Sequence, residues 1–351
     1  MMHKMAIIGF GGMGGWHKEK VKNQLPEITV YGAYDIREEA KEKAKEEGLK
    51  VYQTLEELLK DKEVDIVLVS TPNNFHKNYV IQCLKAGKNV ICEKPVAMNA
   101  SELEDMIAVS KETGKLFSIH QNRRWDRDYK TIQAILSENT IGTPYFIESR
   151  VLGSRGAMHG WRSYQVNGGG MVLDWGVHLI DQALDLIKSP VVSVDAHLQS
   201  IFSNEVDDNI KIFLRFENGV SYLLEMSTNC FINLPRWHMS CTNGTAMIQD
   251  WECNGEIVTL KENGPLKWEN DIVYTAAGPT RTMAPRPDHT VEKLPLPKIE
   301  SDSISYYQNI VGVLDHNDEL IVKPEQALRV MKVIDLIFAS EKAKHGMECN
   351  I

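Results

Sequence analysis

An acidic side chain and an imidazole lie four residues apart in the segment Gly168-Gly-Gly-Met-Val-Leu-Asp-Trp-Gly-Val-His178. On a helix this spacing places Asp174 and His178 on one face, a turn apart. An imidazole titrates near neutral pH, so His178 is a candidate general base, and Asp174 could orient it or bind a neighbouring hydroxyl. A core histidine with a helical carboxylate partner explains the same pair equally well.

A second candidate for chemistry is Lys94, which comes shortly after the apolar run 89–92. That run is typical of a buried strand. In Glu93-Lys94-Pro95 the proline disfavours helical geometry at Lys94, so the lysine stays at the strand end. If that end borders a cofactor crevice, Lys94 can contact a substrate hydroxyl. An ordinary surface lysine is the alternative.

Six residues near the start, Gly9-Phe-Gly-Gly-Met-Gly14, fit the pattern G-x-G-x-x-G. They follow a predicted strand and precede a helix, and Asp35 comes 21 residues after Gly14, where a second strand ends. This context is typical of a dinucleotide site. Gly9 would allow the tight turn, Gly11 a close backbone approach to a pyrophosphate, and Gly14 packing of helix on strand. The helix N-terminus would hold the phosphate charge.

Two further segments bear on the cofactor. Asp35 can accept hydrogen bonds from the ribose hydroxyls of NAD and would repel a 2′-phosphate. Arg37 could soften that repulsion, so NADP stays open as an alternative. Ser70-Thr-Pro-Asn73 follows another apolar strand, and ligands of open α/β sheets bind at this carboxyl edge. An ordinary Pro-Asn turn is the other interpretation.

The elements that must position these residues follow from the apolar pattern. Up to about residue 122, short apolar runs such as 28–34 and 65–70 alternate with helix signals, which predicts a doubly wound parallel sheet. From 191 to 250 strand follows strand with tight turns between them, which predicts antiparallel pairing. Residues 252–300 contain six of the 13 prolines, and we expect them to be irregular.

The predicted fold class is therefore α/β with two domains. Residues 1–122 form an NAD-binding Rossmann domain. Residues 123–351 form an α+β domain for substrate binding and oligomerisation, with an open, mostly antiparallel sheet, and the final helix 324–342 packs back.

The motifs together resemble the Gfo/Idh/MocA family, named for glucose–fructose oxidoreductase and inositol dehydrogenase, in order and spacing over essentially the whole chain. The resemblance implies a catalytic triad of Lys94, Asp174 and His178. It also implies that Trp161-Arg162 reaches the nicotinamide end of the cofactor. In the family the open sheet face packs on another subunit, so we expect a homo-oligomer, a dimer or larger.

The segment His120-Gln-Asn-Arg-Arg-Trp-Asp126 resembles the branch of the family that oxidises sugars and cyclitols. Its arginines could serve a polyhydroxylated ligand or pin the two domains together. Tryptophan stacks well on the C–H face of a sugar, and three tryptophans fall beside chemistry motifs. Those tryptophans are Trp125, Trp161 and Trp175.

We expect one set of residues to contact the cofactor and another to contact the substrate, and we expect no metal site. The expected cofactor contacts are Gly9, Gly11, Gly12, Met13, Gly14, Asp35, Arg37, Ser70, Thr71, Pro72, Asn73, His76, Glu93, Lys94, Gln121, Trp161 and Arg162. The expected substrate contacts are Lys94, Asn122, Arg123, Arg124, Trp125, Arg155, His159, Trp161, Asp174, Trp175 and His178.

The main functional hypothesis is an NAD-dependent dehydrogenase that oxidises a secondary hydroxyl of a sugar or glycoside, with C3 of a pyranose as one position. The alternatives are an inositol dehydrogenase and, from another class, a non-catalytic NAD-binding regulator. The charge of −9, without a dense Lys/Arg block, argues against nucleic acid or an anionic membrane as partner. Without a signal peptide, an apolar span or a paired-cysteine motif, the sequence predicts a soluble cytoplasmic protein.

Overall fold

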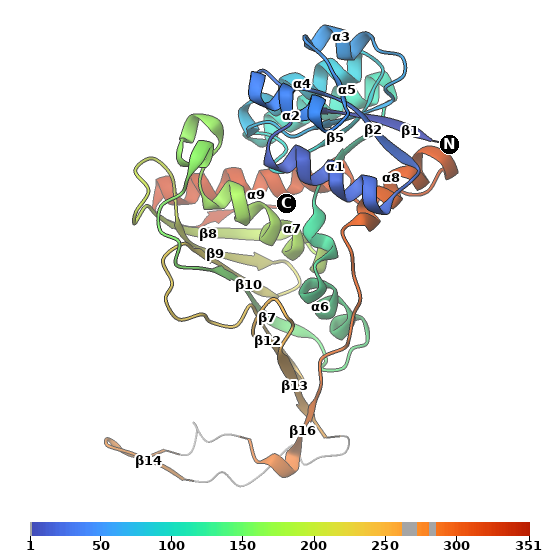
Figure 1. Cartoon of the computed structure of the whole chain (residues 1–351). Coiled ribbons are helices and arrows are strands. Elements are labelled where there is room, and N and C mark those ends of the chain that lie inside the picture. Colours follow the sequence, from blue (N-terminus) through green and yellow to red (C-terminus); the bar gives the residue numbers. More distant parts are fainter. Residues whose placement is uncertain (1, 262–271, 281–285) are drawn as a thin grey trace.

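The computed structural model describes residues 2–261, 272–280 and 286–351. The two large β-sheets lie in separate parts of the molecule, the smaller one in the part that contains the N-terminus (Figure 1). Among the described residues, no helix is both long enough and apolar enough to cross a lipid bilayer.

The first sheet has six parallel strands in the order β3-β2-β1-β4-β5-β6. Every residue of β4 is buried, as expected for a sheet that helices cover. The strand order reverses between β1 and β4, and ligands of such sheets bind beyond the carboxyl ends of the strands at this point. The strands are β1 His3–Ile8, β2 Ile28–Tyr34, β3 Lys50–Val51, β4 Ile66–Val69, β5 Asn89–Cys92 and β6 Phe117–Ile119.

Two helices of this half begin with a side-chain cap. The Thr54 hydroxyl accepts the Glu57 N–H at the start of α3, and Asn99 Oδ1 accepts the Glu102 N–H at 2.9 Å at the start of α5. Each cap satisfies a backbone donor that the first helical turn leaves free. The helices are α1 Gly12–Gln24, α2 Glu38–Glu46, α3 Leu55–Lys60, α4 His76–Lys85 and α5 Ala100–Thr113.

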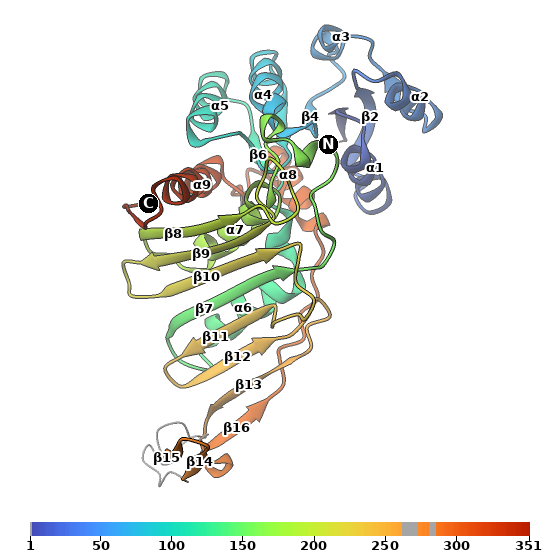
Figure 2. The same cartoon turned by 90° about the vertical axis from the view of Figure 1, so that its left-hand side faces the viewer.

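The second sheet has nine strands in the order β16-β13-β12-β11-β7-β10-β9-β8-β17. Only β7 and β10 pair in parallel, so the predicted open, mostly antiparallel sheet is confirmed. In Figure 2, α6 (Arg127–Ser137) and α7 (Val177–Leu186) lie behind the sheet, and no helix of the described residues covers the face toward the viewer. The main strands are β7 Pro144–Leu152, β8 Val191–Gln199, β9 Asn209–Phe216, β10 Ser221–Ser227, β11 Trp237–Cys241 and β12 Gly244–Ile248.

The expectation that residues 252–300 are irregular is wrong in part. Strand β13 (Gly255–Leu260) pairs with β12, and β16 (Val291–Leu294) pairs with β13, so the excursion extends the second sheet. A short hairpin of β14 (Val273–Thr275) and β15 (Gly278–Thr280) lies between them. The rest of that expectation falls on 262–271 and 281–285, outside the described residues.

The last two long helices lie between the sheets. Helix α8 (Ile304–His316) contacts α1, and α9 (Pro324–Ala343) contacts β8, α7 and α5. A short strand β17 (Met347–Glu348) then pairs with β8 at the sheet edge. The chain after residue 300 therefore packs against both halves of the molecule.

The helix that carries Asp174 and His178 begins irregularly. It opens with a π-helical turn, Val172–Gly176, and continues as α7. Asp207, just before β9, stabilises this start, because its carboxylate accepts the Val172 N–H at 2.8 Å. Gly170 has a φ of +99°, and a Cβ there would lie 2.4 Å from Asp207 Oδ1.

We therefore expect Gly170→Ala to lower the free energy of unfolding by about 2–4 kcal/mol, through backbone strain and displacement of Asp207. Denaturant unfolding measures the change. Gly156→Ala is the matched control, because Gly156 also has a positive φ, +86°, but has nothing within 4 Å of the added Cβ. Equal losses in both variants would show that the contact with Asp207 contributes nothing.

Candidate active site

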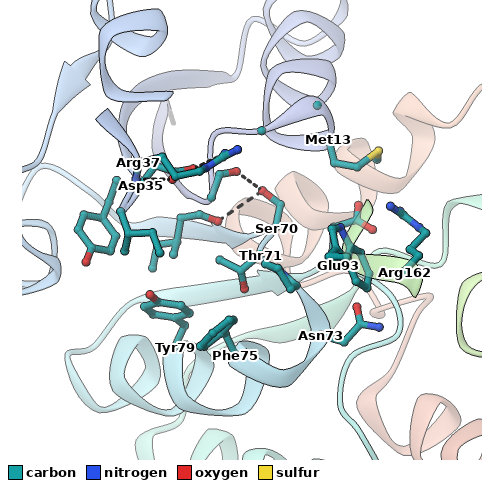
Figure 3. Close-up of a pocket in the computed structure, with 18 of the residues that line it drawn as sticks. Met13, Asp35, Arg37, Ser70, Thr71, Asn73, Phe75, Tyr79, Glu93 and Arg162 are labelled. Carbon is teal, nitrogen blue, oxygen red and sulfur yellow. Dashed lines mark hydrogen bonds and ion pairs between the residues drawn. The ribbon is translucent and has the colours of Figure 1, made fainter. Parts of the chain in front are cut away.

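A cavity of about 650 Å³ lies beyond the carboxyl ends of β1, β2, β4 and β5 (Figure 3). Asp35 and Arg37 lie at one end, and Glu93 and Arg162 lie at the other. Three predicted cofactor residues, Gly14, His76 and Gln121, do not line it. The predicted residues that do line it are Gly9, Gly11, Gly12, Met13, Asp35, Arg37, Ser70, Thr71, Pro72, Asn73, Glu93, Lys94, Trp161 and Arg162.

The glycine loop fits a dinucleotide pyrophosphate. A Cβ at Gly9 would lie 2.7 Å from Ser70 O, and one at Gly14 would lie 2.5 Å from Gly9 O, so both glycines are required by packing. A Cβ at Gly12 would meet nothing within 4 Å, which leaves its backbone open toward the cavity. Helix α1 begins here without a side-chain cap, so its first N–H groups are available to phosphate oxygens.

Asp35 is held as a buried carboxylate. It accepts the backbone N–H groups of Phe10 and Arg37, each at 2.9 Å, and the Arg37 guanidinium at 3.0 and 3.1 Å. Burial alone would raise the pKa of Asp35, but the hydrogen bonds from Arg37 outweigh it, so that pKa lies below its usual range. An ionised carboxylate next to a half-exposed guanidinium can suit ribose hydroxyls or a 2′-phosphate.

We expect Asp35→Ala to weaken NAD binding by about tenfold or more, the value of one or two charged hydrogen bonds. It also frees Arg37 for a 2′-phosphate, so the NADP affinity should rise. Dissociation constants for both cofactors measure the switch. Arg37→Ala, which keeps the carboxylate, should shift the preference the opposite way, and an unchanged NAD/NADP ratio in Asp35→Ala would contradict this assignment.

At the end of the cavity opposite Asp35, Lys94 contacts Asp174, which lies 80 residues further along the chain. Lys94 Nζ donates to the Asp174 carbonyl at 2.9 Å and to Asp174 Oδ1 at 3.2 Å. Arg162 Nε donates to the same Oδ1 at 3.0 Å. Burial raises the pKa of Asp174, but Lys94 and Arg162 outweigh that effect and hold it below its usual range. Asp174 is therefore ionised and orients both cations.

His178 lies beside this group without being bonded to it. Its residue is 4% exposed, and Nδ1 is buried with no hydrogen-bond partner in the described structure. Burial, Lys94 and Arg123 lower the pKa of His178 well below its ordinary value, so the imidazole is neutral at pH 7. Contrary to the expectation that Asp174 could orient the imidazole, the Asp174 carboxylate bonds Lys94 and Arg162.

The predicted substrate residue Trp175 lies against His178, and a second one, Arg123, packs on Trp175. The Trp175 ring centroid is 5.9 Å from that of His178, and the Arg123 guanidinium lies 4.0 Å above the Trp175 ring. Asp126 fixes Arg123 at 2.8 Å. Trp251, which sequence reasoning missed, packs on Trp175 at 5.8 Å from a segment that showed no chemical motif.

The Arg124 guanidinium bonds residues of two helices in the second half of the chain, which differs from the expected tie between the two domains. Its guanidinium bonds both oxygens of Asp181 on α7, at 2.6 and 2.7 Å, and Gln326 Oε1 on α9 at 2.9 Å. These partners lie on helices α7 and α9, so Arg124 links the two helices. Trp125 lies next to it, beside a second hollow that Lys130 also lines.

The other predicted site residues range from fully buried to exposed. His76 is buried between the carbonyl oxygens of Thr71 and Pro95, 2.9 Å from each, so it ties two cavity loops together. Gln121 is 2% exposed and its Oε1 has no partner among the described residues. Asn122 is partly buried, and Arg155 and His159 are exposed.

Sequence reasoning missed the aromatic rings at one end of the cavity and the hydrogen bonds that hold the expected contact Glu93 at the other. Tyr34, Phe75 and Tyr79 line its Asp35 end, as apolar rings without a motif. Under the other end, the imidazoles of His17 and His120 bond the Glu93 carboxylate at 2.6 and 2.9 Å. No spacing in the sequence relates these three residues. Their atoms lie close enough to hold a metal ion, but the distances are those of hydrogen bonds.

A dinucleotide cavity that ends at a lysine and a carboxylate defines a nicotinamide-dependent oxidoreductase. Residues 3–121 match the family model described as the oxidoreductase family, NAD-binding Rossmann fold, and residues 129–247 match the GFO/IDH/MocA C-terminal domain. The chain belongs to the Gfo/Idh/MocA family of oxidoreductases. The family resemblance seen in the sequence is thereby confirmed, as is NAD binding.

Three similar proteins place the chain within the family. A crystal structure of an NAD-binding protein from Listeria innocua is 40% identical, with a TM-score of 0.95 and 99% of each chain covered. The Myo-inositol 2-dehydrogenase of Thermotoga maritima is 31% identical over 64% of this chain and 68% of its own length. An uncharacterized oxidoreductase of Schizosaccharomyces pombe is 34% identical over 61% of this chain, which spans only 60% of that relative's length.

Proposed function

We propose that the protein oxidises a secondary hydroxyl of a sugar or glycoside, with Lys94, Asp174 and His178 as its catalytic residues. The observation that carries the proposal is the contact of Lys94 with Asp174 at the end of the dinucleotide cavity opposite Asp35. An ammonium there can bind the oxygen of a substrate whose C–H bond faces the cofactor. The neutral imidazole of His178 next to it can accept the hydroxyl proton.

Each residue then has a defined part. When bound, the nicotinamide cofactor accepts the hydride from the carbinol carbon. The imidazole of His178 takes the hydroxyl proton, and Lys94 Nζ stabilises the negative charge that develops on the oxygen. Asp174 fixes the Lys94 ammonium at 3.2 Å and keeps Arg162 beside it. Trp175 and Arg123 offer an aromatic face and donors for the substrate's other hydroxyls.

A cyclitol is the competing substrate. It offers the same ring of secondary hydroxyls, and the T. maritima relative is named for myo-inositol. We favour the larger sugar or glycoside because Arg155 and His159, two expected substrate contacts just before Trp161, are exposed.

Reduction of NAD and NADP, followed at 340 nm with inositols, free hexoses and aryl glucosides, tests the proposal. We expect turnover with hexoses or glucosides and a keto sugar as product, with C3 as the first position to examine by NMR. Turnover with inositols alone would replace the sugar by a cyclitol. Absence of turnover with all three classes would overturn the proposal.

We also propose that a second copy covers the open face of the nine-stranded sheet. Phe146 and Phe213 lie 6.3 Å apart on it, and Leu223 pairs with Phe213 across the strands. We expect a dimer or larger assembly in light scattering at micromolar concentration, and Phe213→Asp should shift it toward the monomer because it buries a charge. A wild-type monomer under those conditions would contradict the proposal.

A further inference from the structure

Glu93 is a buried acid for which the reaction above has no role. It follows β5 directly and precedes Lys94. Its side chain is 8% exposed, yet it lines the cavity at the end away from Asp35 (Figure 3). A group in this position faces whatever part of the cofactor reaches Lys94.

Hydrogen bonds fix the carboxylate from three elements. Oε1 accepts from His17 Nε2 of α1 at 2.6 Å and from His120 Nδ1 after β6 at 2.9 Å, and Oε2 accepts the Lys94 backbone N–H at 3.1 Å. The hydroxyl of Tyr307 on α8 lies 2.6 Å from His17 Nδ1. With the phenol as donor to Nδ1, His17 carries its proton on Nε2 and donates it to Glu93.

The carboxylate keeps its charge in this setting. Burial alone would raise the pKa of Glu93, but His120 and His17 outweigh it and hold that pKa well below the usual range. Burial lowers the pKa of His17, so this partner is a neutral donor at pH 7.

The carboxylate forms ion pairs only with imidazoles among the described residues, those of His17 and His120. The two cations at this end of the cavity, Lys94 Nζ and Arg162, are both bonded to Asp174. No lysine or arginine of the described residues forms an ion pair with Glu93. A buried carboxylate that has no lysine or arginine partner can be stabilised further by a cationic ligand at the cavity wall.

The cofactor supplies such a charge in only one of its redox states. The nicotinamide ring is a cation when oxidised and neutral when reduced. We propose that Glu93 is the counter-charge of the oxidised nicotinamide ring, so that the protein binds the oxidised cofactor in preference to the reduced one. His17 and His120 act as positioning residues that hold the carboxylate at the cavity wall. This inference rests on NAD binding and is independent of which substrate the enzyme takes.

The test is binding without substrate. Calorimetry gives the dissociation constants of NAD and NADH for the wild type, Glu93→Gln and Glu93→Asp. We expect Glu93→Gln to shift the NADH/NAD ratio of dissociation constants about tenfold toward NADH, the scale of one charge at short range in a partly solvated site. Glu93→Asp keeps the charge and should retain a ratio near that of the wild type.

The controls separate the charge from general damage. Glu63→Gln removes an exposed carboxylate that pairs only with Lys4, so both constants should stay unchanged. If Glu93→Gln does not fold, the double variant His17→Leu with Glu93→Met removes the charge together with its donor, a replacement that buried ionic clusters often tolerate. Equal weakening of NAD and NADH, or no change in the ratio, would overturn the proposal. Because no substrate is present, these results do not depend on the proposed reaction.

Discussion

Lys94→Ala should lower kcat by about three to four orders of magnitude while leaving NAD binding intact, because the developing alkoxide loses the ammonium that stabilises its charge. The Lys94 side chain is 15% exposed and its Nζ is already aligned by the Asp174 carbonyl and carboxylate, so little reorganisation accompanies the reaction. The pyrophosphate and ribose sites, at the glycine loop and Asp35, are untouched by the change.

Steady-state rates with a substrate found in the screen, and a separate NAD titration, measure the two effects. Lys77→Ala is the matched control, since Lys77 lies on α4 and pairs with Asp105 on α5. It should keep wild-type rates. Near-normal turnover by Lys94→Ala would remove this lysine from the chemistry, and lost NAD binding would make it a cofactor ligand instead.

The first half of the fold could be predicted closely because its signals are local. Strands at 28–34 and 89–92 have the predicted bounds. In a parallel sheet, each strand is buried on both faces, so its apolar run stands out without knowledge of its neighbours.

Strands β13 and β16 were missed for the opposite reason. Strand β16 is short, lies near prolines and pairs with a strand distant in the sequence, and β13 pairs with its neighbour β12 but also holds that distant β16. The π-helical turn before α7 is likewise set by Asp207, more than 30 residues beyond it, through the bond to the Val172 N–H.

The candidate site divides in the same way. The cofactor end is encoded within one strand-turn-helix unit and an acid at the next strand, so Gly9 to Gly14 and Asp35 could be assigned from spacing. The chemical end depends on contacts between distant segments. Spacing alone suggested that Asp174 serves His178, whereas the fold brings Lys94 and Arg162 to its carboxylate.

Replacement of His178 by asparagine should lower kcat by about two to four orders of magnitude, the usual contribution of a general base. Asparagine has a similar size and hydrogen-bonding groups but cannot accept a proton near neutral pH. His345→Asn is the control, because His345 is exposed after α9 and bonds only a local carbonyl.

The pH dependence identifies the role of His178 more sharply than the rate loss does. A base must be unprotonated, and burial with Lys94 and Arg123 keeps the pKa of His178 well below its ordinary value. For alcohol oxidation, kcat/KM of the wild type should therefore stay level as the pH falls through 6.5 and decline only under more acidic conditions. The imidazole in His178→Asn is absent, so its residual rate should lack that acidic limb and rise with hydroxide instead. A wild-type profile that already halves near pH 6.5 would mean that the imidazole is exposed to water in the free enzyme, and an unchanged profile in His178→Asn would assign the base to another group.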